Sequence, residues 1–244
     1  MDYQTVRMLS ELDNVFYQAN HASFSATRSH AWDGWQRVAT SFARSPRTVL
    51  DVACGNLRFK SFLAACGLAP HANYYAIDSC AELVPPNEDV SFQNLDIIAR
   101  LAEGTLGQSI TAPPCDLVAC FGFMHHVPTT ALRMRLLETL IGKTAPQGLA
   151  ALSFWQFARD KAAREKAMHT TERACAELGM LLDKGDYLLG WNNVEGAYRY
   201  CHSFSDDEMD SFISAVDGRA SLVDRFRADG RTGEMNGYLV FRKR

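Results

Sequence analysis

The sequence lacks several features that would place it in a class at once. No stretch of it approaches about 20 consecutive apolar residues, so no membrane span is expected. Its first residues show no basic start followed by an apolar run, which predicts no signal peptide and a cytoplasmic location. Lysine and arginine (25) are balanced by aspartate and glutamate (28), and the net charge of -3 gives no global sign of nucleic-acid binding.

The seven cysteines form no Cys-x-x-Cys pair, and several of them lie in apolar runs. Such scattered thiols are typical of reduced, buried cysteines in a cytoplasmic protein rather than of a disulfide framework. A catalytic cysteine would need a neighbouring base and an electropositive setting, and neither is evident. We therefore predict no nucleophilic cysteine and no metal site.

The chain does have the material for one large core. Its 244 residues are 47% hydrophobic, which suits a single domain over residues 1–244. Short apolar runs alternate with helical patterns and predict strands at 47–54, 73–79, 90–97, 113–123 and 148–157. Residues 219–244 predict a terminal antiparallel hairpin with a Gly-rich turn. The expected fold is α/β, with a doubly wound, seven-stranded and mostly parallel sheet.

Two segments depart from this alternation of strands and helices. Residues 3–19 have helical periodicity, and we expect residues 1–40 to form an N-terminal helical lid. Residues 158–204 begin with a charged helical run and interrupt the alternation, so we expect an insertion over the carboxyl edge of the sheet. The charged run at 159–173 is either a solvated helix face or a surface that contacts RNA.

Residues 50–59, LDVACGNLRF, indicate a ligand site. A buried strand runs into a turn that holds a single glycine, Gly55, with Asp51 beside it. A pyrophosphate would favour more glycines and disfavour the acid, so the pattern favours a nucleoside-like ligand that carries a cation. Asp78 ends the next strand, where it can bond both ribose hydroxyls. At the third strand end, Asp96 can accept from an exocyclic amine and Ile97 can cover a base.

The segments VLDVACGNLRF, YYAIDS, NLDI and CDLVACFGFMHHVP, in this order, resemble class I S-adenosylmethionine-dependent methyltransferases. The loop of that family reads D/E-x-G-x-G-x-G, and Ala53 and Leu57 replace two of its glycines here. The resemblance implies a Rossmann-like methyltransferase fold with S-adenosylmethionine as cofactor. The residues expected to bind it are Tyr17, Arg28, Trp32, Asp51, Ala53, Gly55, Asn56, Asp78, Ser79, Asp96, Ile97 and Phe121.

The second half is similar to the tRNA wobble-uridine carboxymethyl methyltransferases. The segment Arg199–His202, RYCH, followed by the acidic residues 206–208, carries this resemblance. It implies methyl transfer to a carboxylate oxygen, which is already a nucleophile and needs no strong base. Arg199 is expected to grip the substrate carboxylate, with His202 as helper and His125 as a further catalytic candidate. Some relatives need a small activating protein partner, so the resemblance adds such a protein to the candidate partners.

Several alternatives stay open. The acceptor is tRNA or a small-molecule carboxylate or phenol, and the acidic composition favours the small molecule. A third hypothesis is a non-catalytic scaffold with a degenerate cofactor loop. Trp155 and Trp191 either stack on a base or pack the insertion, and the terminal FRKR either touches phosphates or ends a solvated strand.

Overall fold

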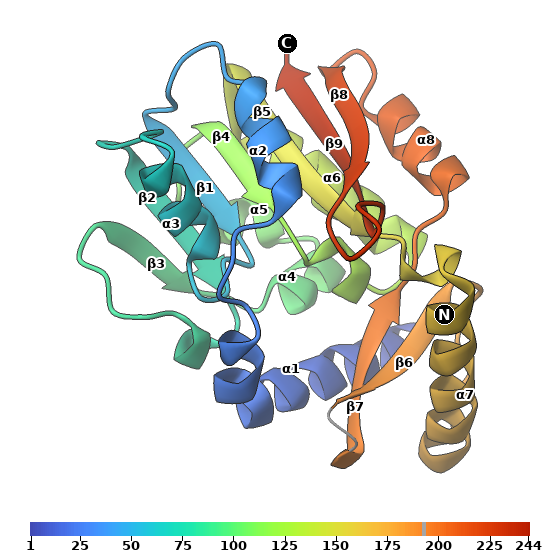
Figure 1. The fold of residues 1–244 in the computed structure, drawn as a ribbon. Helices are drawn as coiled ribbons and strands as arrows, with labels where there is room; N and C mark the ends of the chain where they lie inside the picture. The colour runs from blue at the N-terminus through green and yellow to red at the C-terminus, as the bar shows by residue number, and fades with distance from the viewer. Residues whose placement is uncertain (192–193) are drawn as a thin grey trace.

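The computed structural model describes residues 1–191 and 194–244, which form a layered α/β fold (Figure 1). Its seven-stranded sheet has the order β3-β2-β1-β4-β5-β9-β8. The strands from β1 to β5 pair in parallel, and β9 pairs antiparallel with both β5 and β8. The strands are β1 (Thr48–Val52), β2 (Asn73–Asp78), β3 (Val90–Asn94), β4 (Cys115–Cys120), β5 (Thr144–Trp155), β8 (Ala220–Ala228) and β9 (Asn236–Lys243). The predicted mostly parallel sheet with a terminal hairpin is confirmed.

Helices cover both faces of this sheet. They are α1 (Tyr3–Ala26), α2 (Asp33–Thr40), α3 (Arg58–Ala65), α4 (Ile97–Glu103), α5 (Leu106–Ser109), α6 (Thr130–Lys143), α7 (Lys161–Leu178) and α8 (Asp206–Ala215), with short 3-10 helices η1 (Ala81–Leu83), η2 (Met124–His126) and η3 (Phe157–Arg159). The first helix extends to Ala26, beyond the predicted end at residue 19. Thr129 caps α6, because its hydroxyl accepts from the Leu132 amide at 3.3 Å.

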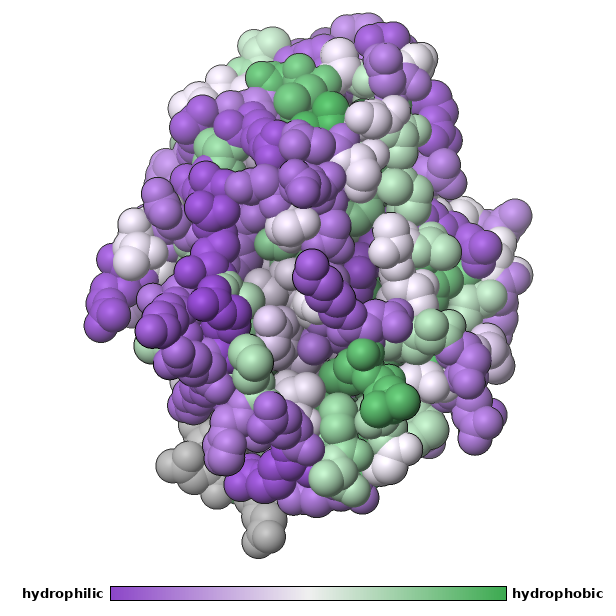
Figure 2. All heavy atoms as spheres, turned by 90° about the vertical axis from the view of Figure 1, so that its right-hand side faces the viewer, coloured by the Kyte–Doolittle hydropathy of each residue, from purple (hydrophilic) through white to green (hydrophobic). Residues whose placement is uncertain are grey.

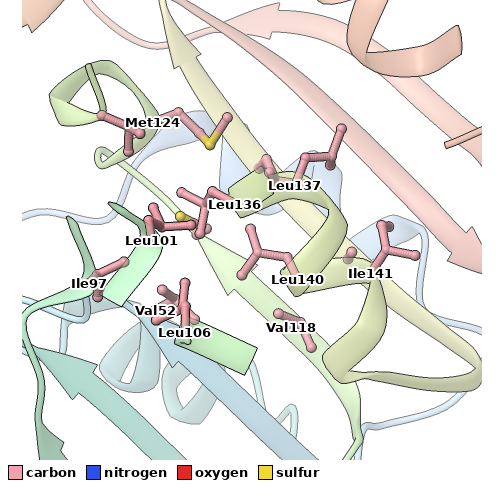
Figure 3. Close-up of a cluster of buried hydrophobic side chains, with 14 of the residues drawn as sticks. Val52, Ile97, Leu101, Leu106, Val118, Met124, Leu136, Leu137, Leu140 and Ile141 are labelled. Carbon is pink, nitrogen blue, oxygen red and sulfur yellow. The ribbon is translucent and has the colours of Figure 1, made fainter. Parts of the chain in front are cut away.

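The core divides between the two faces because side chains alternate along each strand. Val49 faces the cluster with α2 and α3, whereas Leu50 faces the cluster with α4, α5 and α6. Figure 3 shows part of this second cluster, in which leucines of α6 pack against β1 and β4. Its labelled members are Val52, Ile97, Leu101, Leu106, Val118, Met124, Leu136, Leu137, Leu140 and Ile141. Each buried Leu or Ile contributes about 1.5–3 kcal/mol to folding.

A second, two-stranded sheet lies beyond the carboxyl ends of the parallel strands, with α1 and α7 beside it (Figure 1). It pairs β6 (Asp186–Trp191) with β7 (Val194–His202). Leu9 of α1, Ala174 of α7, and Leu188 and Tyr200 of the hairpin share one small core. This core attaches the hairpin to α1, and so places both over one edge of the main sheet.

The charged run at 159–173 lies largely on α7, whose buried residues are only Ala167 and Ala174. Figure 2 shows the side of the molecule that carries α7 and α8, and hydrophilic residues cover most of it. The charged side chains of the run are therefore mostly exposed on one helix, as both interpretations of the run require.

The terminal basic residues lie away from the carboxyl ends of the parallel strands, because β9 runs antiparallel to β5. Arg242 donates to the Gln147 carbonyl at 3.0 Å, and Lys243 donates to the Gly142 carbonyl at 3.2 Å. These two cations therefore bond to backbone carbonyls at the end of the sheet opposite the carboxyl ends of the parallel strands. Among the described residues, no helix combines the length and the apolar character that a membrane crossing requires.

Candidate functional site

A cavity of about 380 Å³ lies where the parallel strands end. One side, here called the strand-end side, consists of residues 53–56, 78–80 and 96–98, which follow β1, β2 and β3. The opposite side, here called the hairpin side, is built by α1, η2, the end of β5 and β7. Every residue that the sequence assigns to the cofactor lines this cavity, as do Arg199 and His125.

The loop after β1 keeps the backbone shape of a glycine-rich turn without the glycines. Ala53, Gly55 and Leu57 all have positive φ, at 59°, 51° and 60°. These are the three positions at which the related loop pattern has glycine. The Leu57 side chain does not enter the cavity, because it is 2% exposed and packs in the core beside α3. The replacements therefore strain the backbone and leave the cavity open.

Asp51 lies inside the structure rather than on the surface of the turn. It is 3% exposed and accepts a hydrogen bond from the Tyr74 hydroxyl at 2.7 Å. Burial raises the pKa of its carboxyl to about 7. The hydrogen bond from Tyr74 opposes this change, and the nearby charge of Asp78 contributes to it. A carboxyl held this way would be stabilised in its charged form by a cationic group in the cavity.

Asp78, at the end of β2, bonds to the loop that follows β1. Its two oxygens accept from the Gly55 amide and the Cys80 amide, both at 2.9 Å. Burial raises the pKa of this carboxyl, although the amides of Cys80 and Gly55 oppose the change. Each oxygen keeps acceptor capacity for a ligand hydroxyl, because a carboxylate oxygen can accept more than one bond.

The third strand end is held by α1. Asp96 caps α4 by accepting from the Ala99 amide at 2.9 Å, and its second oxygen accepts from the Asn14 amide group at 3.2 Å. The Ser79 hydroxyl donates to the same Asn14 side chain at 3.3 Å. Ile97 is buried and lines the cavity beside them. Asn14 lies in the helical pattern of α1 and has no motif around it, so sequence reasoning missed it.

An aromatic wall closes one flank of the cavity. Trp32 and Trp35 lie with ring centroids 5.4 Å apart, and Phe121 lies 5.7 Å from Trp35. A Cβ on Gly122 would come within 3.0 Å of the Trp32 ring, so glycine permits this close approach. Trp35 is the buried member of the pair, and its indole Nε1 has no hydrogen-bond partner among residues 1–191 and 194–244.

Two cationic side chains complete that flank. Arg28 stacks on the ring of Phe24 at 3.9 Å, and Arg58 lies 5.4 Å from the ring of Trp32. Burial, with a smaller contribution from the neighbouring charge of Arg28, lowers the pKa of Arg58 to about 10. Arg58 was not predicted, because it follows the last glycine position of the loop pattern and begins α3.

The Arg199 side chain lies on the hairpin side of the cavity. Its guanidinium lies 5.3–5.9 Å from four rings, and only 8% of the residue is exposed. These rings belong to Phe16, Phe24, Trp155 and Trp191. Its Nε is buried and has no hydrogen-bond partner among the described residues. A buried donor without a partner gains substantially from an anionic ligand.

His125 lies close to Arg199 and is uncharged. Its ring is 5.0 Å from that of Trp155, and its buried Nδ1 has no hydrogen-bond partner in the part of the chain that the structure describes. Burial lowers its pKa well below the ordinary value, and the charges of His126 and Arg199 act in the same direction. Trp155 lines the cavity, whereas Trp191 does not and instead anchors the hairpin on α1 by bonding the Ser23 hydroxyl at 3.3 Å.

His202 is not at the site, which corrects the expectation that it helps Arg199. Its Nδ1 lies 2.6 Å from Asp186 and its Nε2 lies 2.8 Å from Glu208. Arg133 joins this network through Asp186 at 3.0 Å. Side chains alternate along β7, but Arg199 and His202 are three residues apart and so point to opposite faces of the strand. His202 holds the hairpin to the body of the protein.

One cluster has the composition of a metal site. Ring nitrogens of His125 and His126 and the Cys201 thiol lie within 4.8 Å of one another. Both ring nitrogens of His126 already have partners, in Tyr17 and Asp13. The cluster therefore offers no free nitrogen on His126 to a metal ion.

A family model described as a methyltransferase domain matches residues 25–208. No curated protein matches the sequence significantly. Among solved structures, a SAM-dependent methyltransferase from Methanosarcina mazei is similar at a TM-score of 0.59 and 16% identity, over 85% of this chain and 96% of that one. The DhpI-SAM-HEP complex is similar at 0.59 and 18% identity, over 96% and 97% of the two chains.

A third structure adds to this agreement. The Burkholderia thailandensis 1,6-didemethyltoxoflavin-N1-methyltransferase, with S-adenosylhomocysteine bound, is similar at a TM-score of 0.53 and 15% identity, over 94% of this chain and 88% of that one. At these identities, the likeness is one of fold.

Proposed function

Because this chain belongs to the family of methyltransferase domains, we propose that it transfers a methyl group from S-adenosylmethionine to a carboxylate oxygen of an acceptor that Arg199 holds. The observation that carries the proposal is the Arg199 guanidinium. Aromatic rings enclose it beside the cavity, and its Nε has no hydrogen-bond partner within the described part of the chain. Its surroundings suit a planar group that bears an anion.

The side chains on the strand-end side have the hydrogen-bonding and charged groups that the cofactor requires. Asp51 would stabilise the ammonium of the methionine part, and Asp78 would accept from the ribose hydroxyls. Asp96 and Ile97 would bind the adenine edge and face, and Arg28 would bind the methionine carboxylate. When bound, S-adenosylmethionine supplies an electrophilic methyl group on a sulfonium.

The hairpin side suits the acceptor. A carboxylate is nucleophilic at neutral pH, so the protein's work is to align it and to exclude water. Arg199 would hold the oxygen that does not attack, and the rings of Trp155 and Phe24 would flank the planar part. We extend the proposal to α1 and the 158–204 segment, which would act as the cover that keeps water out. Tyr17 and Arg199 support this, because each brings one of those segments to the cavity wall.

The first candidate acceptor is a carboxymethylated wobble uridine of tRNA. In its favour, Arg199 of the RYCH segment lines the cavity, as the resemblance to that family leads one to expect. A small aromatic acid is the second candidate. The net charge of -3 favours it, and so does the position of the terminal cations at the far edge of the sheet.

The test is methyl transfer from labelled S-adenosylmethionine to two acceptors, tRNA with carboxymethyluridine and a panel of aromatic carboxylic acids. We expect a product whose label is released by mild alkali, as an ester requires. Arg199→Gln should lower turnover by about a hundredfold or more, while Arg199→Lys, which keeps the charge but loses the planar fork, should lower it by about tenfold. Binding of S-adenosylhomocysteine should stay unchanged in both variants. An alkali-stable product would rule out the carboxylate, and cofactor binding without turnover on any acceptor would support a scaffold.

A further inference from the structure

A line of three polar side chains connects α1 to η2 at the hairpin side. Asp13 and Tyr17 are four residues apart on α1, so they lie on one face of the helix. Asp13 Oδ2 lies 3.0 Å from His126 Nδ1, and the Tyr17 hydroxyl lies 2.8 Å from His126 Nε2. Asp13 and His126 are each 5% exposed, whereas Tyr17 is only partly buried and lines the cavity.

The surroundings determine where His126 carries its hydrogen. Its Nδ1 faces two acceptors, the Asp13 carboxylate and the Tyr200 carbonyl, the latter at 2.8 Å. Asp13 is held in place because its other oxygen accepts from the Tyr200 amide at 2.7 Å. Nδ1 must therefore donate in both protonation states of the ring. A change of protonation takes place at Nε2, the nitrogen that contacts Tyr17.

We propose that Tyr17 is a catalytic residue that donates a hydrogen bond to the non-attacking oxygen of the acceptor, and that His126 and Asp13 are positioning residues that direct its hydroxyl hydrogen into the cavity. This inference rests on the proposed carboxylate acceptor. A protonated His126 donates from Nε2 to the Tyr17 oxygen. That oxygen then cannot donate back to His126, so its own hydrogen turns toward the cavity, where Arg199 also lies.

The charges around the chain support a donor rather than a base. Burial raises the pKa of the Tyr17 phenol, so this hydroxyl keeps its proton. Burial alone would lower the pKa of His126, but the Asp13 carboxylate, which also bonds its Nδ1, acts in the opposite direction, and the net change raises that pKa well above the ordinary value. His126 is therefore charged at neutral pH.

The groups that face His126 come from four elements. Asp13 and Tyr17 belong to α1, His125 to η2, Asp78 to the end of β2, and Arg199 and Cys201 to β7. When the pH rises through the pKa of His126, Nε2 loses its proton and becomes an acceptor. The Tyr17 hydroxyl then donates to His126 instead of to the acceptor. Turnover should therefore fall as the pH rises.

The experiment measures kcat/KM for the acceptor against pH, at saturating S-adenosylmethionine, in wild-type protein and three variants. Tyr17→Phe should lose about tenfold to a hundredfold in kcat/KM and lose the high-pH decline. Its affinity for S-adenosylhomocysteine should stay within about twofold, because Tyr17, which the sequence assigned to the cofactor, lies on the hairpin side of the cavity. Asp13→Asn should retain Tyr17 but move the decline to lower pH, because His126 loses the carboxylate that raises its pKa. Tyr187→Phe, on a half-buried tyrosine of β6 outside the cavity, is the matched control and should match wild type.

Two failures can be told apart. Wild-type protein that forms no alkali-labile ester overturns the proposed function and this inference with it. An active wild type overturns the inference alone if Tyr17→Phe keeps the same kcat/KM and the same pH profile. If Asp13→Asn is folded and active with an unshifted decline, the assignment of His126 and Asp13 as positioning residues is overturned. Direct titration of the His126 ring by NMR in wild type and in Asp13→Asn checks the shift without turnover.

Discussion

The two sides of the cavity are built in different ways. On the strand-end side, Asp51, Asp78 and Asp96 each lie in or directly after a parallel strand, and adjacent strands bring them together. On the hairpin side, Arg199 meets Tyr17 and His125 only because α1, η2 and β7 pack against one another. The first side is local and depends on backbone geometry, whereas the second depends on contacts between distant segments.

The difference extends to the energetics. The strand-end side rests on carboxylates that accept from backbone amides, as Asp78 and Asp96 do. The hairpin side rests on buried charged pairs, Asp13 with His126 and Arg133 with Asp186. Such pairs are costly to break, because a lone charge is left without water or a partner. Changes on the hairpin side should therefore affect stability, while those on the strand-end side should affect cofactor affinity.

The largest effect is expected at Arg133. It donates to Asp186 at 3.0 Å and to the Tyr200 hydroxyl at 2.7 Å, and its side chain is 3% exposed. Arg133→Met should lower the free energy of unfolding by about 3 kcal/mol or more, because the buried Asp186 carboxylate loses its arginine and keeps His202 and the Tyr200 hydroxyl as partners. Denaturant unfolding measures this loss. Arg219→Met, which breaks an exposed pair, is the control and should change stability by less than about 1 kcal/mol.

Asp78→Asn should show the opposite pattern. The substitution removes a charge that would bind the ribose and leaves one of two backbone amides without its acceptor. We expect the dissociation constant of S-adenosylhomocysteine to rise by about tenfold to a hundredfold, equivalent to a loss of about 1.5–3 kcal/mol. Calorimetric titration measures it, with Arg199→Gln as the companion variant that should keep its affinity. Equal weakening in both variants would contradict the division of the cavity into two sides.

Cofactor affinity should depend on pH through Asp51, whose pKa is raised by burial to about 7. The charged form binds the ammonium, so affinity should rise as the pH rises through about 7 and fall by up to about tenfold per pH unit below it. The stability of the ligand-free protein should move the other way. A raised folded pKa stabilises below the unfolded value and loses that contribution as the pH rises through the folded one. Asp51→Asn should remove both dependences, as titration and thermal unfolding across this pH range would show.

The smallest effect is expected in the loop after β1. Ala53 has a φ of 59°, which glycine adopts without strain, so Ala53→Gly should stabilise the protein by up to about 1 kcal/mol. Leu57→Gly relieves a similar φ but removes a side chain that is 2% exposed, and should destabilise by about 2 kcal/mol or more. Thermal unfolding of the pair separates backbone strain from packing. A destabilised Ala53→Gly protein would show that the loop is not strained.

Sequence reasoning succeeded where a residue's position follows from its own strand. Asp78 and Asp96 could be located because a parallel sheet brings successive strand ends to one edge. It failed for His202, whose spacing from Arg199 places it on the other face of β7. It missed Asn14, whose contacts depend on how α1 crosses the sheet edge.

The sequence alone determined the sheet, its terminal hairpin and the acids at its edge, because apolar periodicity and strand ends are properties of neighbouring residues. Only the tertiary structure decided which histidine meets Tyr17 and Asp13, because both residues are more than 100 positions from His126 in the chain. It also decided that Arg199 would be enclosed by aromatic rings, since these come from α1, β5 and the hairpin. No local sequence pattern encodes contacts between residues so far apart in the chain, because these contacts result from the packing of the whole chain.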